Sequence, residues 1–256
     1  MQPLLTVHQL TKRYGDICAC DRIAFSLYPG QVLGIIGESG SGKSTLLKAI
    51  AGQVPIDTGE IQYRDRADNL INLRTLAEPQ HRQLMKTEWG FVQQNPGDGL
   101  RLGVTAGANI GERLLDVGHR HYGKIRTEAL AWLSQVELPD GRIDDLPSTF
   151  SGGMQQRLQL ARILVTRPRL VLMDEPTGGL DVSVQAKLLD LMRSLVRTLH
   201  LSVILVTHDI GVVRLLAQRL LVMQNGQVVE AGLTDQVLDD PHHPYTQQLV
   251  NATLTP

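Results

Sequence analysis

The stretch Gly37–Thr45 reads GESGSGKST, and the rest of the chain is organised around it. It matches the phosphate-binding pattern G-x-x-x-x-G-K-[ST], with Lys43 and Ser44 at the two chemically distinctive positions. The apolar run VLGII at 32–36 predicts a buried strand before the loop, and LLKAIA at 46–51 predicts a helix after it. A strand–loop–helix context is the one that gives this pattern its meaning.

Each residue type in the loop has a chemical reason. Glycines allow backbone N–H groups to turn inward around phosphate oxygens, and the following helix N-terminus adds a partial positive charge. Lys43 can reach the β- and γ-phosphates, and the hydroxyl of Ser44 can ligate Mg²⁺. The predicted nucleotide-binding residues of the loop are Gly37, Ser39, Gly40, Gly42, Lys43, Ser44 and Thr45. A chance Gly-rich turn is the alternative, and the further motifs below argue against it.

Composition excludes several classes of protein. The 256 residues include 25 Lys+Arg and 26 Asp+Glu, a net charge of −1, so no basic excess points to nucleic acid. Hydrophobic residues make up 42% but aromatic residues only 4%, which predicts an aliphatic core of the kind found around parallel sheets. The sequence contains one phosphate loop, which argues against a fused pair of such nucleotide-binding domains.

The chain carries two cysteines, Cys18 and Cys20, too close in sequence to bridge readily and without partners for a metal site. They are expected to be free thiols in a reducing compartment. The N-terminus does not resemble a signal peptide, and no apolar run approaches 18 residues. We therefore expect a cytoplasmic protein without direct membrane insertion.

The order of patterns along the chain predicts an α/β fold interrupted by helices. Strands are expected at 4–10, 23–27, 89–92, 170–173 and 202–206, with 60–63 as an edge strand and 64–87 as a polar excursion ending in a short helix. From Val104 to Leu164 the apolar spacing becomes helical. Asn225-Gly226 lies between two apolar runs, which is a strong hairpin signal.

A second motif, LVLMDE at Leu170–Glu175, places two carboxylates at the end of an apolar strand. In phosphate-loop proteins a carboxylate at this edge holds Mg²⁺, a role we assign to Asp174. Glu175 points elsewhere and could polarise a water for in-line attack on the γ-phosphate. A strand meeting a polar turn is the alternative, and it weakens downstream of a phosphate loop.

The third motif, SGGMQQR at Ser151–Arg157, opens a helix with a good N-cap and two glycines. It predicts a second anion site built from backbone N–H groups. One nucleotide does not need two such sites, so the second is expected to serve a nucleotide bound by another copy. An ordinary capped helix is the alternative, although that would not need both glycines.

Together these motifs resemble those of ATP-binding-cassette ATPases, in the same order and over essentially the whole chain. The resemblance implies ATP and Mg²⁺ as cofactors and a head-to-tail homodimer. It makes Gln94 a further Mg²⁺ and water contact, places Asp181 at the dimer seam and brings His208 to the γ-phosphate. Ser151, Gly152, Gly153 and Gln155 would then close over the partner's nucleotide. Without the resemblance, a histidine after an apolar strand is more often structural.

Tyr14 has two interpretations. By itself, a tyrosine in KRYG is an exposed turn residue. Its position ahead of the phosphate loop instead favours an aromatic platform for adenine, and we adopt that hypothesis.

Within the superfamily, two groups compete. PTGGLDVSVQA and the tail DDPHHPYTQQLV look like the dipeptide, oligopeptide and nickel importer ATPases. NPGDGLR at Asn95–Arg101, TEWG and RIDDLPSTFSGGMQQR instead resemble the cassette protein of the bacterial carbon–phosphorus lyase system. That resemblance implies a soluble carbon–phosphorus lyase core complex as the partner, and it is the interpretation we favour.

The resulting fold expectation is a phosphate-loop cassette with a mostly parallel core sheet, an antiparallel N-terminal β subdomain and a helical signature subdomain. As one ATPase domain over 1–256, it would divide into a nucleotide-binding core (1–93 and 165–240), a helical subdomain (94–164) and a C-terminal tail (241–256). We further expect Gly97–Arg101 and the adjoining helix to contact the partner, with Arg101 meeting a carboxylate there. The pairs His119/His121 and His242/His243 are expected to be an exposed loop and a tail turn.

Overall fold

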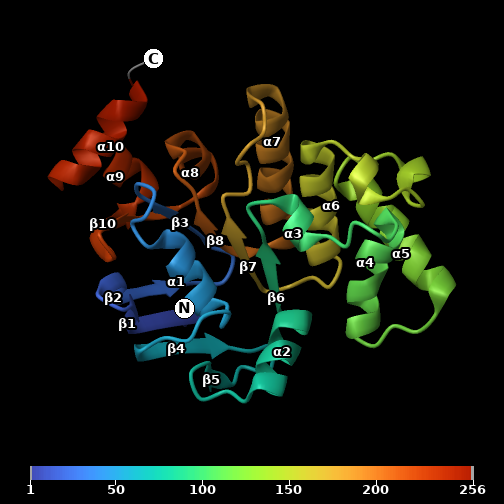
Figure 1. The fold of residues 1–256 in the computed structure, drawn as a ribbon, viewed down its shortest axis with the longest axis horizontal. Helices are drawn as coiled ribbons and strands as arrows, with labels where there is room; N and C mark the ends of the chain where they lie inside the picture. The colour runs from blue at the N-terminus through green and yellow to red at the C-terminus, as the bar shows by residue number, and fades with distance from the viewer. Residues whose placement is uncertain (1, 255–256) are drawn as a thin grey trace.

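In the computed structural model, which describes residues 2–254, the strands form two sheets (Figure 1). The larger sheet has six strands in the order β10-β9-β3-β8-β7-β6. Its strands are β3 (Val32–Ile36), β6 (Trp89–Val92), β7 (Leu170–Asp174), β8 (Ser202–Val206), β9 (Arg219–Gln224) and β10 (Gln227–Leu233). All neighbours from β9 to β6 are parallel, and only β10 pairs antiparallel, across the predicted Asn225-Gly226 turn. The expected mostly parallel core sheet is confirmed.

The smaller sheet is antiparallel and has the order β2-β1-β4-β5. Its strands are β1 (Leu5–Tyr14), β2 (Ile17–Leu27), β4 (Thr58–Arg64) and β5 (Leu70–Asn72). The expectation that 60–63 is an edge strand was wrong, because β4 lies between β1 and β5. The three residues of β5 pair with β4 from within the polar stretch, and so short a strand leaves no period for the sequence to reveal.

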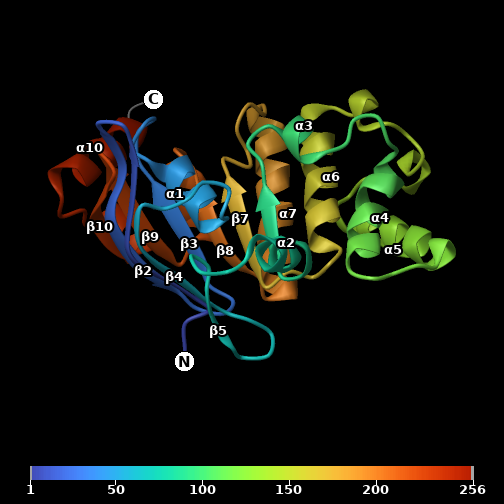
Figure 2. The ribbon, with the colours of Figure 1, turned by 60° about the horizontal axis from the view of Figure 1, so that its bottom comes forward.

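Helices follow β3 and fill the segment between β6 and β7, as predicted. Those near the phosphate loop and before β6 are α1 (Lys43–Ile50) and α2 (Glu78–Thr87). Residues 93–169 hold α3 (Pro96–Gly99), α4 (Ala106–Asp116), α5 (Tyr122–Gln135), α6 (Gly152–Leu164) and two short 3₁₀ turns, Asp140–Arg142 and Pro147–Thr149. The C-terminal part holds α7 (Val182–Leu199), α8 (Ile210–Leu216), α9 (Thr234–Asp239) and α10 (Pro244–Leu254). Figures 1 and 2 show α4 and α5 at the end of the molecule opposite α9 and α10.

Two apolar clusters cover the two faces of the six-stranded sheet. Alternate residues of β3 point to opposite faces, so Leu33 and Ile35 belong to one cluster and Val32 and Ile36 to the other. The first cluster includes α1 and the antiparallel sheet, which lie side by side in Figure 2. The second includes α6, α7 and α8. With both faces covered, the carboxyl ends of β3, β7 and β8 form the exposed crevice where ligands of parallel sheets bind.

No helix within residues 2–254 combines the length and apolarity that crossing a bilayer requires.

Candidate active site

The phosphate loop connects β3 to α1 and has a shape that only glycine permits at two positions. A Cβ atom on Gly37 would lie 2.2 Å from the carbonyl oxygen of Met223, and one on Gly42 would lie 2.0 Å from that of Ala19. Both glycines also have positive φ, +151° and +103°. Helix α1 begins directly after Gly42, so its first N–H groups face the loop. The loop can therefore present backbone donors to an anion.

Lys43 is buried at the base of this loop, 6% exposed. Its Nζ donates to the carbonyl oxygens of Gly37 and Glu38, each at 2.7 Å. Burial lowers the pKa of Lys43, while the carboxylates of Glu175 and Asp174 raise it. A desolvated ammonium group next to inward-facing N–H groups is suited to a polyphosphate.

Asp174 ends β7, which parallel pairing brings alongside β8 next to β3. The hydroxyl of Ser44 donates to Asp174 Oδ1 at 2.9 Å. Asp174 is 5% exposed, and burial raises its pKa. A carboxylate and a hydroxyl form a hard oxygen donor pair that fits Mg²⁺, an ion that prefers a few protein oxygens combined with substrate phosphates and water. Among the residues described, no cluster of three or more His, Cys, Asp or Glu could form an all-protein metal cage.

Glu175 and His208 form a close pair beside the phosphate loop. The Nδ1 atom of His208 lies 2.6 Å from Glu175 Oε2. The backbone of Glu175 has φ +45°, a left-handed conformation that is rare for residues with a Cβ, and its N–H donates to the carbonyl oxygen of Val206. Such outliers cluster at functional sites, where surrounding contacts fix them. The side chain of Glu175 thus contacts His208, whereas Asp174 engages Ser44.

These side chains, contributed by separate parts of the sequence, line one cavity of about 840 Å³. It is within the range of cavities that hold small molecules and cofactors. Most of the predicted site residues meet there: Ser39, Gly40, Gly42, Lys43, Ser44, Thr45, Gln94, Glu175 and His208. Five further residues line the same cavity and were missed from the sequence: Ile17, Cys18, Ala19, Asn225 and Gly226. Only the folded chain brings β2 and the β9–β10 turn against the loop, so their local sequence carries no such signal.

Tyr14 does not line this cavity. It pairs across the β1–β2 hairpin with Ile17, which does line the cavity, and Tyr14 itself is 49% exposed. Lys12 Nζ lies 5.1 Å from the centre of its ring. Its role as an adenine platform stays a prediction.

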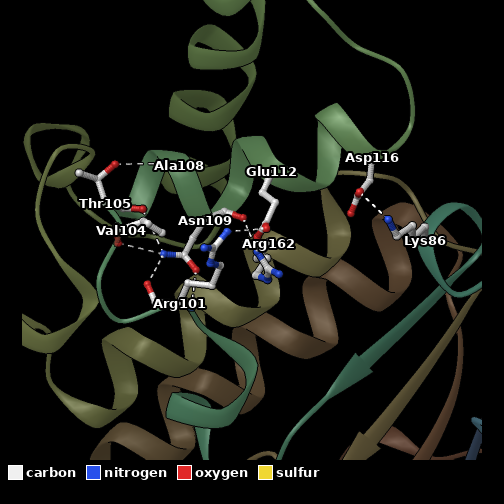
Figure 3. Close-up of polar contacts among 9 residues, drawn as sticks. All are labelled: Lys86, Arg101, Val104, Thr105, Ala108, Asn109, Glu112, Asp116 and Arg162. Atoms are coloured by element: carbon white, nitrogen blue, oxygen red, sulfur yellow. Dashed lines mark hydrogen bonds and ion pairs between the residues drawn. The ribbon is translucent and has the colours of Figure 1, made fainter. Parts of the chain in front are cut away.

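The segment that begins with Gln94 is held by buried amides at both of its ends. At one end, the N–H of Gln93 donates to Oε1 of Gln159 on α6 at 2.5 Å. At the other, Asn109 on α4 accepts from the N–H of Arg101 and donates to the Arg101, Val104 and Thr105 carbonyl oxygens (Figure 3). Gln159 and Asn109 are both fully buried. The loop that carries Gln94 is thus fastened to the helices.

The signature segment begins α6 as predicted. Ser151 is the N-cap, and its Oγ accepts from the N–H of Met154 at 3.4 Å. Gly152 and Gly153 are the first two residues of the helix, and a Cβ on Gly153 would lie 2.4 Å from Val184 Cγ1. The side chain of Gln155 donates back to the carbonyl oxygens of Pro147 and Phe150.

Ser151 and Gly153 line a second cavity, of about 280 Å³, which shares no lining residue with the larger one. Asp181 is the N-cap of α7, and its carboxylate accepts at 3.0 Å from the N–H of Val184, a residue that lines this second cavity. That hydrogen bond holds the pKa of Asp181 below its usual value. Within one chain, the signature residues therefore do not contribute to the cavity of the phosphate loop.

The remaining polar candidates have local roles. Cys18 and Cys20 are free thiols, and burial, followed by the neighbouring Cys18, raises the pKa of Cys20 to about 12. His121 caps α5 through Nδ1, and the backbone N–H groups of His242 and His243 donate to Glu230. The expected loop and tail turn are confirmed.

Comparison with known proteins agrees with this geometry. Residues 20–178 match the family described as ABC transporter. The chain is 62% identical over 253 residues to the putative phosphonates utilization ATP-binding protein PhnK of Escherichia coli (strain K12), covering 99% of this chain and 98% of that one. It is 38% identical over 255 residues to the dipeptide transport ATP-binding protein DppD of Haemophilus influenzae, covering 97% of this chain and 77% of that one.

Solved structures give the same result. The ATP-binding cassette MJ0796, as a dimer bound to ADP and Pi in a post-hydrolysis state, superposes with a TM-score of 0.80 at 29% identity, over 90% of this chain and 98% of that one. The fold expected from the sequence is thereby confirmed, and the chain belongs to the ABC transporter family as an ATP-binding-cassette ATPase.

Proposed function

We propose that this chain is the ATP-hydrolysing subunit of a phosphonate-utilisation system and acts as a head-to-tail homodimer on a soluble carbon–phosphorus lyase core complex. The observation that carries the catalytic part is the convergence of Lys43, Ser44, Gln94, Glu175 and His208 on one cavity. The similarity to the phosphonate utilization protein over nearly the full length of both chains supports the biological part.

In this proposal the phosphate loop and Lys43 bind the β- and γ-phosphates of ATP. Glu175 is the general base for the attacking water, and the 2.6 Å contact with His208 orients its carboxylate. His208, two-thirds exposed at the rim, would also contact the γ-phosphate. Gln94 lies on the same cavity and would orient the water.

Mg²⁺ would be held by Ser44 and Asp174, with Gln94 as a further contact. The bound ion would neutralise charge that develops on the phosphate oxygens. Both Ser44 and Asp174 are already placed by their mutual hydrogen bond, so little rearrangement of the protein is needed.

The dimer follows from the separation of the two predicted anion sites. Ser151 and Gly153 line a cavity apart from the phosphate loop, so they would serve the nucleotide of a second copy together with Asp181. The structural relative MJ0796 is a dimer. We further propose that the chain divides into a nucleotide-binding core (1–93 and 165–240), a helical part (94–164) and a tail (241–256). In this division α6 belongs to the helical part and carries the signature residues toward the partner.

Importer ATPases are the second candidate class, because DppD is 38% identical over most of the chain. The loop after Gln94 favours the first class, since its sequence NPGDGLR is one of the segments that resemble the cassette protein of the carbon–phosphorus lyase system. The proposed location is the cytoplasm, in accord with two free thiols.

A pull-down from cells grown on a phosphonate as the sole phosphorus source tests the partner. Recovery of soluble lyase subunits would support the proposal, whereas recovery of permease subunits in the membrane fraction would favour an importer. Replacing Lys43 by Ala tests the site separately, because unchanged ATP affinity would contradict the phosphate-loop assignment.

The loop Gly97–Arg101 stays our proposed contact with the lyase core, but Arg101 also has a partner within its own chain. The structure gives Arg101 a carboxylate within its own chain, because Nη1 donates to Glu112 Oε1 at 2.9 Å (Figure 3). Arg162 on α6 contacts the other oxygen of Glu112 at 2.7 Å. The double variant Asp98→Ala/Arg101→Ala should abolish co-purification, and Glu112→Ala shows how much of that loss comes from the internal ion pair.

A further inference from the structure

The C-terminal tail, which the catalytic scheme leaves without a role, reaches the phosphate loop. The hydroxyl of Tyr245, in the first turn of α10, accepts a hydrogen bond from the backbone N–H of Glu38 at 2.8 Å. These residues are 207 positions apart. Tyr245 is 4% exposed, and its ring belongs to the apolar cluster that includes α8 and α9.

This hydrogen bond acts on the peptide unit that also holds Lys43. In a trans peptide the C=O and N–H groups point in opposite directions. The carbonyl oxygen of Gly37 accepts from Lys43 Nζ at 2.7 Å, and the N–H of the same unit, that of Glu38, donates to Tyr245. The Gly37–Glu38 peptide is therefore fixed from both sides.

Gly37 is a residue whose backbone freedom such a clamp would restrict. Its φ of +151° is accessible to glycine because it lacks a Cβ atom, and the same freedom allows alternative orientations of the adjoining peptide. Tyr245 supplies a partner that excludes these alternatives without occupying the nucleotide cavity, whose lining does not include it.

The tail is itself fastened to the core sheet. Both carboxylate oxygens of Glu230, on β10, accept from the backbone of the tail, Oε1 from His242 N–H at 2.9 Å and Oε2 from His243 N–H at 3.1 Å. The Nδ1 atom of His243 in turn accepts from the N–H of Tyr245 at 3.2 Å. A continuous set of hydrogen bonds thus runs from β10 through the tail to the phosphate loop.

We propose that Tyr245 is a positioning residue for nucleotide binding, which sets the orientation of the Gly37–Glu38 peptide and through it the placement of Lys43. Glu230 is the anchor that holds Tyr245 in place. The inference rests on the proposed function only in taking the phosphate loop as the ATP site.

The test uses the full chain and the substitution Tyr245→Phe, which removes one oxygen and keeps the buried ring. Loss of one neutral hydrogen bond should raise the Kd for the analogue AMP-PNP with Mg²⁺ about fivefold and the KM for ATP by a similar factor. The kcat at saturating ATP should stay within about twofold, because Glu175, His208 and Gln94 are untouched. Hydrogen exchange at the Glu38 amide should become faster.

Tyr63→Phe is the matched control. Tyr63 is fully buried and donates to Glu88 at 2.8 Å, and neither residue lines the nucleotide cavity. The Tyr63→Phe variant should have a lower melting temperature and an unchanged Kd for AMP-PNP. This result would separate a positioning effect from a general loss of stability. Glu230→Ala should raise the Kd in the same direction, and the double variant Glu230→Ala/Tyr245→Phe should be no weaker than the worse single variant, because both act through one contact.

An unchanged Kd for AMP-PNP in Tyr245→Phe would overturn the inference whatever the Glu38 exchange rate, and so would equal weakening by Tyr63→Phe. Lys43→Ala separates this failure from a failure of the proposed function. If Lys43→Ala loses AMP-PNP binding while Tyr245→Phe keeps parent affinity, the phosphate loop is the ATP site and only the role of Tyr245 is wrong.

Discussion

Replacing Glu175 by Gln should separate ATP binding from hydrolysis more cleanly than any other single change at this site. The amide has nearly the same size and shape as the carboxylate, and the side chain of Glu175 is only 16% exposed. An amide oxygen can still accept from His208, so the 2.6 Å contact and the unusual backbone at φ +45° should persist. The variant loses the basicity of the group and very little else.

The size of the effect follows from that loss. General-base catalysis contributes about 10²–10⁴-fold to a rate, which corresponds to about 3–5 kcal/mol of barrier. Lys43, Ser44 and Asp174 are unchanged in Glu175→Gln, so the Kd for ATP should stay within about twofold and the melting temperature should change little. We expect hydrolysis to fall by at least about a hundredfold.

The assay combines single-turnover ATP hydrolysis with size-exclusion chromatography in ATP. The variant should bind ATP, hydrolyse it slowly and accumulate the ATP-bound dimer, whereas the parent should return to the unliganded form. A hydrolysis rate equal to that of the parent would refute the role of Glu175. A parallel loss of binding would show instead that Glu175 holds the nucleotide.

Three further predictions concern the frame of the site. Gly42→Ala should lower ATP affinity by more than tenfold in a binding titration, because residue 42 has a φ of +103° and an added Cβ would lie 2.0 Å from a carbonyl oxygen. An affinity equal to that of the parent would show that this backbone shape is not required for ATP binding. Asp174→Asn should abolish Mg²⁺-dependent hydrolysis and change the pH dependence of stability. The pKa of Asp174 is raised in the folded state, so the folded state binds this proton more tightly than the unfolded state does. The stability of the parent should therefore fall as the pH rises from the ordinary Asp pKa through the folded-state value. Denaturation measured between about pH 3 and pH 7 should show a weaker decline in the Asn variant. Asn109→Leu should lower the free energy of unfolding by about 1–3 kcal/mol, because it removes the side-chain acceptor of the Arg101 N–H and one donor to each of three carbonyl oxygens. Unchanged urea unfolding would contradict this role.

The sequence predicted the core elements well because their signals are local. The strand, loop and helix around Lys43, the N-cap at Ser151 and the Asn225-Gly226 hairpin each follow from residues within a few positions of one another. The position of β4 was mispredicted because it depends on a short strand, β5, whose three residues have no period. The internal contact of Arg101 with Glu112 of α4 was not predicted from the sequence, and the contact of Arg101 with a partner stays a prediction.

The sequence by itself determined the type of chemistry, because the phosphate loop, the acidic strand end and the Ser-Gly-Gly helix start require particular residue types at fixed local spacings. Only the tertiary structure decided which distant groups complete the site. The Ser44–Asp174 and Glu175–His208 contacts depend on parallel strand pairing, and the Tyr245–Glu38 contact depends on the tail folding back over the sheet. The physical reason is that spacing along the chain constrains neighbours within a turn or a strand, whereas contacts over 130 or 207 residues are set by packing of the whole core.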